Sequence, residues 1–153
     1  MPRLSEQVLI PHAADDVFSV VQDIRRYPEF IRWVKRMQVR DETVAGDVYS
    51  CVGEVDVTFK GFDERFSTRV VADRARRTVK VDLVKGPFRH LRNRWQLDPR
   101  EGEATRVHFF IDYEFRNPVL GLLARTNTRY AVSQIMEAFR GEARRRFGGS
   151  DAV

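Results

Sequence analysis

The most regular hydrophobic pattern in the chain lies in its last third. From Pro118 to Phe147, apolar residues recur at steps of three and four, the spacing that places them on one face of an α-helix. Asn117 can cap the first turn, and Pro118 suits the first helical position. Gly148 and Gly149 favour an end to the helix. A helix of about 30 residues is roughly 45 Å long, so we expect it to lie across a wide partner.

The first third of the chain predicts a strand followed by two helices. Residues 5–10 alternate as in a strand, which Pro11 ends. Asp15 and Asp16 suit a helix N-terminus, and the apolar face of this helix would consist of Val17, Val20, Val21 and Ile24. Pro28 fits only a first helical turn, so a second, shorter helix is expected to carry Phe30, Ile31 and Trp33.

Between Val34 and Phe115 the hydrophobic period changes to two, which predicts strands. Turn signals at 45–47, 61, 73–77 and 85–87 divide this region into about six strands. Clean alternation is typical of an antiparallel sheet with one dry face and one wet face. The element order therefore predicts an α+β fold, with residues 1–153 forming a single domain. A sheet this wide curls, and a helix held in the curl favours a cavity between the two.

Three local stretches carry a resemblance to a known family. They are Asp23–Trp33, Gly86–Trp95 and Phe109–Leu120, and the Gly-Pro-Phe to Asn-x-Trp stretch is the most specific of them. They are similar to the coenzyme Q-binding branch of the START and polyketide-cyclase superfamily. The resemblance implies the helix-grip fold, a curved antiparallel sheet of six to seven strands wrapped around a long C-terminal helix. It implies ubiquinone as the bound ligand, with no required cofactor, although members of the branch also act on the ribosome.

The inward rows of the predicted sheet and helix are the candidate ligand site. They are mostly apolar, as expected for the wall of a cavity that takes a lipophilic molecule. Asn93 and Tyr113 are its obvious hydrogen-bonding members, although a backbone partner would satisfy Asn93 equally well. The candidate ligand-binding residues are Trp33, Val55, Val57, Phe59, Phe66, Phe88, Leu91, Asn93, Trp95, Phe109, Ile111, Tyr113, Leu123 and Met136.

Charge adds a second candidate surface. The chain has 27 Lys and Arg against 22 Asp and Glu, a formal net charge of +5, which favours anionic surfaces such as phospholipid or RNA. Basic and aromatic residues gather near the cap formed by the two predicted helices and are expected to face a membrane or RNA. They are Arg25, Arg26, Tyr27, Phe30, Ile31 and Arg32.

Length and composition bound the location and the partners. No apolar run approaches the roughly 18 residues of a membrane span, and the one cysteine, Cys51, cannot form an internal disulfide. We expect a monomeric cytoplasmic protein that reaches the inner face of a bacterial membrane, or the matrix side of a mitochondrion if the chain is processed from a eukaryotic precursor. No DNA partner is expected.

The sequence offers little for catalysis or metal binding. His12, His90 and His108 are far apart in sequence, and a surface metal site shared by His90 and His108 is disfavoured against two solvated histidines. No nucleophile motif or phosphate-binding loop occurs, and the paired acids fall in helix starts or turns. We therefore predict no metal and no catalytic residue.

Three functions remain, in this order. The first is a non-enzymatic quinone chaperone that supports respiratory electron transport. The second is an interaction protein that acts on the ribosome, like the toxin members of the branch. The third is a polyketide cyclase or dehydratase in which Tyr113 or Asn93 polarises the substrate. The fold alone does not separate them.

Overall fold

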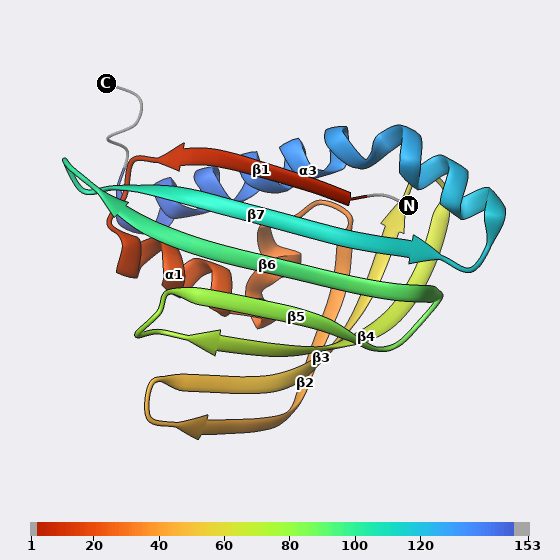
Figure 1. The fold of residues 1–153 in the computed structure, drawn as a ribbon, viewed down its shortest axis with the longest axis horizontal. Coiled ribbons are helices and arrows are strands. Elements are labelled where there is room, and N and C mark those ends of the chain that lie inside the picture. The colour runs from red at the N-terminus through yellow and green to blue at the C-terminus, as the bar shows by residue number, and fades with distance from the viewer. Residues whose placement is uncertain (1–2, 149–153) are drawn as a thin grey trace.

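The computed structural model describes residues 3–148 and shows a long helix lying across a curved, seven-stranded antiparallel sheet (Figure 1). The strand order is β1-β7-β6-β5-β4-β3-β2. The strands are β1 (Arg3–Ile10), β2 (Val34–Ala45), β3 (Val48–Phe59), β4 (Phe62–Asp73), β5 (Thr78–Lys85), β6 (Phe88–Arg100) and β7 (Ala104–Phe115). The helices are α1 (Ala14–Gln22), the 3₁₀ turn η1 (Ile24–Arg26), α2 (Tyr27–Phe30) and α3 (Pro118–Phe147). The predicted α+β helix-grip architecture is confirmed.

Both predicted ends of the long helix are in place. The Asn117 side-chain oxygen accepts hydrogen bonds from the backbone N–H of Val119 at 2.8 Å and of Leu120 at 3.4 Å. At the other end the N–H of Gly148 donates to the Arg144 carbonyl at 2.9 Å, and its φ of 117° suits glycine. Gly149 lies outside the described residues.

The second helix is shorter than expected. It ends at Phe30, so the prediction that Ile31 and Trp33 are helical is wrong. Ile31 is extended, with φ −101° and ψ 109°, and the carbonyl of Trp33 accepts a hydrogen bond from the Thr58 N–H at 2.9 Å. The segment after α2 is therefore tied to the end of β3, which places Trp33 beside that strand.

An aromatic cluster fills the space between the sheet and the C-terminal half of α3. Phe139 lies at its centre, with its ring centroid 4.9 Å from that of Trp95, 5.2 Å from Phe30 and 5.3 Å from Tyr27. Trp95 also meets Phe109 edge-on at 4.9 Å. Such edge-to-face contacts add to the stabilisation from area burial. This half of the fold is solid core, and it shares its end of the sheet with α1 (Figure 1).

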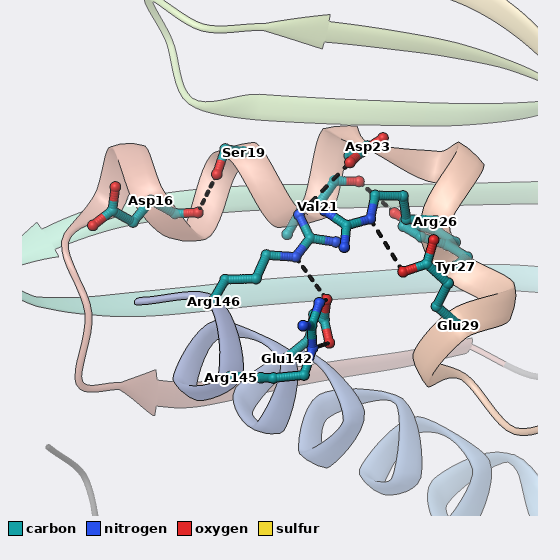
Figure 2. Close-up of polar contacts among 10 residues, drawn as sticks. All are labelled: Asp16, Ser19, Val21, Asp23, Arg26, Tyr27, Glu29, Glu142, Arg145 and Arg146. Carbon is teal, nitrogen blue, oxygen red and sulfur yellow. Dashed lines mark hydrogen bonds and ion pairs between the residues drawn. The ribbon is translucent and has the colours of Figure 1, made fainter. Parts of the chain in front are cut away.

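A buried carboxylate near the end of α3 holds two arginines of the same helix, and one of them reaches the segment after α1 (Figure 2). Glu142 is 4% exposed and accepts hydrogen bonds from Arg145 and Arg146, both at 2.6 Å. Arg146 also reaches Asp23, with 3.6 Å between nitrogen and oxygen. The two guanidinium groups lower the pKa of Glu142 to about 2. The carboxylate therefore stays charged in the folded protein down to strongly acidic pH.

Candidate ligand cavity

A cavity of about 220 Å³ lies under the N-terminal half of α3. It opens at the end of the sheet where β3 and β7 finish and β4 and β6 begin. The wall is mostly apolar, which suits a lipophilic ligand. Its lining residues are Trp33, Val57, Phe59, Phe66, Phe88, Leu91, Ile111, Tyr113, Phe115, Ala124, Asn127, Thr128, Ala131, Val132 and Ile135.

Small side chains on α3 make room for this cavity. Ala124, Thr128 and Ala131 follow at steps of four and three, so they share one helix face. Further along the helix the inward positions carry Met136 and Phe139, which are buried in the core. The space between helix and sheet is therefore partly unfilled beneath these small residues and filled by core side chains towards the end of α3.

The Gly86-Pro87-Phe88 stretch builds one end of the cavity. A Cβ on Gly86 would lie 2.4 Å from the Cβ of Phe66, so only glycine allows this turn to touch β4. Phe88, just after the turn, is buried. It meets the Phe66 ring edge-on at 5.0 Å and stacks on the Phe115 ring at 4.5 Å. The most family-specific stretch of the sequence thus forms an aromatic wall.

Polar groups of the cavity gather where β7 faces α3. The hydroxyl oxygen of Tyr113 lies 2.5 Å from that of Thr128, and the Thr128 hydroxyl donates to the Ala124 carbonyl at 2.6 Å. One residue earlier in the helix, the Asn127 amide donates to the Leu123 carbonyl at 2.7 Å. Burial raises the pKa of Tyr113 above its ordinary value near 10, so the phenol is neutral at physiological pH.

A larger open groove of about 460 Å³ adjoins the cavity, and Trp33 and Phe59 line both. Its rim carries Arg32, Lys35 and Lys60, none of which lies within ion-pair distance of a carboxylate in residues 3–148. The groove therefore shares a wall with the cavity, and its mouth, which carries these three cations and the carboxylate of Glu137, is cationic on balance. On the other side, a pocket of about 80 Å³ beside Leu123 shares Phe66 and Phe88 with the cavity.

The candidate ligand residues divide into three groups. Those in the cavity wall are Trp33, Val57, Phe59, Phe66, Phe88, Leu91, Ile111 and Tyr113. Leu123 lines the small pocket beside it. The remaining members are placed away from the cavity, in the core and the sheet next to the aromatic cluster, and are Val55, Asn93, Trp95, Phe109 and Met136.

The expectation that Asn93 presents its amide to a ligand is corrected by its hydrogen bonds. Its nitrogen donates to the Phe110 carbonyl at 2.9 Å, and its oxygen accepts from the Trp95 indole N–H at 2.8 Å. The amide therefore serves to hold the Trp95 ring in the core. A backbone partner was the alternative that the sequence left open.

Several wall residues were missed by sequence reasoning. They are Phe115, Ala124, Asn127, Thr128, Ala131, Val132 and Ile135. One signal was available, because residues 126–128 place three polar side chains inside a helix with an apolar stripe. Of these polar residues, Asn127 and Thr128 line the cavity together with Tyr113, and Thr128 contacts its hydroxyl.

The predicted membrane- or RNA-facing set divides into apolar members, which are not exposed as expected, and basic members, which are at the surface. Ile31 is buried, and Tyr27 packs on Phe139 while its hydroxyl donates to the Val21 carbonyl, so the expectation that these two insert into a bilayer is wrong. Phe30 packs on the same ring and is half-buried. The basic members lie at the surface. Arg25 pairs with Glu42 at 2.7 Å and Arg26 with Glu29 at 3.2 Å, whereas Arg32 lines the open groove.

The histidines do not come together. His90 pairs with the backbone position of Glu114 and His108 with that of Gln96, so the two lie about six residues apart along neighbouring strands, roughly 20 Å. Each is half-buried with a carboxylate partner rather than simply solvated, His90 at 3.1 Å from Asp112 and His108 at 2.8 Å from Asp98. Within residues 3–148 no three His, Cys, Asp or Glu side chains form a cluster that could hold a metal ion.

Comparison with known proteins places the chain in a family. Residues 10–140 match the family model described as polyketide cyclase / dehydrase and lipid transport. The protein belongs to this family. The resemblance predicted from its three motif stretches is confirmed. None of the helices in the described part of the chain is long and apolar enough to span a membrane.

Individual relatives are similar over most of their length. The ribosome association toxin RatA of Escherichia coli (strain K12) is 27% identical over 139 residues, covering 91% of this chain and 85% of the relative. The mitochondrial coenzyme Q-binding protein coq10 of Schizosaccharomyces pombe is 25% identical over 138 residues, covering 89% and 83%. An aromatase/cyclase structure from Streptomyces sp. R1128 superposes with a TM-score of 0.84, covering 97% of each chain, and at 17% identity it shows the fold alone.

Proposed function

We propose that this protein binds an isoprenoid quinone, ubiquinone, and acts as a quinone chaperone that supports respiratory electron transport. The observation that carries the proposal is the cavity under α3, an apolar and aromatic enclosure with a single cluster of hydrogen-bonding groups. A quinone ring has flat apolar faces and polar oxygens at its edge. The cavity likewise combines apolar walls with one polar side. The similarity to a coenzyme Q-binding protein supports this choice of ligand.

The volume of the cavity suits a quinone ring whose isoprenoid tail lies outside the cavity. About 220 Å³ lies below the volume of typical pockets for drug-sized ligands, roughly 300–1,000 Å³, so the cavity accommodates a headgroup rather than a whole polyprenyl quinone. The tail would leave past Trp33 and Phe59 into the open groove, whose lining is shared with the cavity. Phe59, Phe88 and Tyr113 offer aromatic faces and edges to the ring.

We propose binding without catalysis. Acid-base chemistry needs a titratable group that faces the substrate and has a suitable pKa. The described residues that line the cavity include no carboxylate and no histidine, and burial moves the pKa of Tyr113 further from neutrality. The aromatase/cyclase likeness concerns the fold, so it adds no catalytic group to this cavity.

Titration with a short-chain ubiquinone tests the proposal. We expect calorimetric or fluorescence binding curves that saturate at one ring per chain, because the cavity admits one headgroup. An isoprenoid alcohol of the same chain length, which lacks the ring, is the control and should bind weakly. Equal binding of the two would mean that the protein recognises tails rather than rings, and would contradict the proposal.

The cationic mouth predicts salt-sensitive docking on anionic vesicles. Exposed charges are screened over about 10 Å at 0.1 M ionic strength, so vesicle binding should weaken as salt rises. Replacing Arg32, Lys35 and Lys60 together by Gln should weaken binding further, because these cations surround the groove and have no carboxylate partner among residues 3–148. Sedimentation with vesicles containing phosphatidylserine measures both effects.

Two comparisons complete this experiment. The matched control replaces Arg25 and Arg26 by Gln, which removes charges that already pair with Glu42 and Glu29 and should cost less vesicle binding. Ribosomal subunits form the second arm, because a relative carries the name of a ribosome association toxin. Salt-sensitive sedimentation with subunits, together with no binding to vesicles, would favour the ribosome function instead.

A further inference from the structure

The hydrogen positions in the polar cluster of the cavity are determined by two short contacts. The Tyr113 and Thr128 hydroxyl oxygens are 2.5 Å apart, and the Thr128 oxygen is 2.6 Å from the Ala124 carbonyl oxygen. Oxygens this close repel unless a hydrogen lies between them. The carbonyl has no hydrogen to give, so Thr128 donates to Ala124 and Tyr113 donates to Thr128. The other acceptor near the Tyr113 hydroxyl is the same carbonyl, at 3.4 Å, so either direction of donation stays inside the protein. Both hydroxyl hydrogens are thereby used inside the protein.

Asn127 is arranged in the same way. Its side-chain nitrogen donates to the Leu123 carbonyl at 2.7 Å and to the Thr126 hydroxyl at 3.1 Å, which uses both N–H bonds of the amide. Its carbonyl oxygen has no hydrogen-bond donor within residues 3–148. Asn127 lines the cavity, as Tyr113 does. This part of the wall therefore offers a ligand hydrogen-bond acceptors and no free hydrogen-bond donor.

We infer that the cavity prefers the reduced ligand, a quinol, over the oxidised quinone. The inference rests on the proposed function and deepens it. A quinol hydroxyl can donate a hydrogen bond to the Tyr113 or Asn127 oxygen. A quinone carbonyl carries no hydrogen, so it cannot form this bond, and its lone pairs would meet those of the protein oxygens. The indole N–H of Trp33, also in the wall, can donate to either a carbonyl or a hydroxyl oxygen, so it does not discriminate.

The preference has a consequence for the bound molecule. A ligand that binds better in its reduced form is, by linkage, reduced more easily when bound than when free. The chain itself exchanges no electrons in this account. Such a carrier suits delivery of quinol to an enzyme that oxidises it, because the carrier stabilises the form that this enzyme consumes.

The test compares a short-chain ubiquinone with its quinol under anaerobic conditions, in the full chain. We expect the quinol to bind about tenfold more tightly, which corresponds to one net hydrogen bond. The quinol dimethyl ether, which has the same ring and no hydroxyl hydrogen, should bind like the quinone. Asn127→Leu and Tyr113→Phe each remove one acceptor oxygen, and each should lower the affinity for the quinol more than the affinity for the quinone, which reduces the preference.

The outcomes separate the inference from the proposed function. If both forms bind and the quinone is equal to or tighter than the quinol, the inference is overturned and the quinone-binding function stands. A preference that persists in the double variant Tyr113→Phe/Asn127→Leu would also overturn it, because the discriminating acceptors would then lie elsewhere. Binding of neither form would overturn the proposed function and the inference together.

Discussion

Replacing Ala131 by Trp should lower the affinity for a short-chain ubiquinone by about a hundredfold or more, equivalent to roughly 3 kcal/mol. Ala131 lines the cavity from α3, and its methyl group is one of the small side chains that leave the space between helix and sheet unfilled. An indole at this position would occupy much of a space of about 220 Å³. The ring of the ligand and the new side chain would then compete for the same volume.

The matched control is Ser133→Trp, which adds the same indole to the exposed side of α3 two residues further on. It should leave the affinity within about twofold, because surface substitutions of this kind rarely change more than a few tenths of a kcal/mol. Thermal unfolding checks that Ala131→Trp still folds cooperatively. A folded Ala131→Trp protein that binds the quinone as tightly as the parent would refute the position of the site.

Glu142→Gln should destabilise the fold by roughly 3 kcal/mol at neutral pH. The substitution leaves the buried side of Arg146 without the carboxylate that pairs it, and weakens the attachment of α3 to η1 and its flanking Asp23. Denaturant unfolding monitored by circular dichroism measures the difference. The control is Glu137→Gln on the same helix, where the side chain is 68% exposed and lies 3.9 Å from Arg140, so the expected loss is below about 0.5 kcal/mol.

The interaction between Glu142 and the arginines predicts that the stability of the fold depends on pH. The pKa of Glu142 is about 2 in the folded protein, against an ordinary value of 4.5. A lowered folded-state pKa contributes stability that is fully present above pH 4.5 and is lost as pH falls towards 2. The stability difference between parent and Glu142→Gln should therefore shrink over that window. A difference that stays constant from pH 6 to pH 2 would mean that the carboxylate charge does not hold the helices together.

The strands could be predicted from the sequence because the alternation of buried and exposed residues in each strand is a local pattern. In β7, the buried residues Val107, Phe109 and Tyr113 share one row of alternate positions, and a sheet with one buried face leaves only one orientation for such a row. Turn residues then divided the rows at the observed places. The start of α3 could be predicted for the same reason, because Asn117 caps the backbone N–H groups of the residues that follow it.

The division between core and cavity could not be read in this way. It depends on which turn of α3 faces which part of the sheet, and that register is a long-range property. Trp95 and Phe59 look alike in their strand patterns, yet Trp95 meets Phe139 and becomes core, while Phe59 faces the small residues of α3 and lines the cavity. The same limit misplaced Tyr27, whose exposure depends on Phe139, more than a hundred residues away.

In the proposed complex, a quinone ring lies between the sheet and the start of α3. The chain contains two tryptophans, and only Trp33 lines the cavity, while Trp95 is buried beside Phe139. Titrating Trp95→Phe, in which Trp33 is the remaining reporter, with a short-chain ubiquinone tests the claim most directly. We predict strong quenching that saturates at one equivalent, and weaker quenching in Trp33→Phe. Quenching that is equal for both tryptophans, or that rises without saturation, would contradict the account.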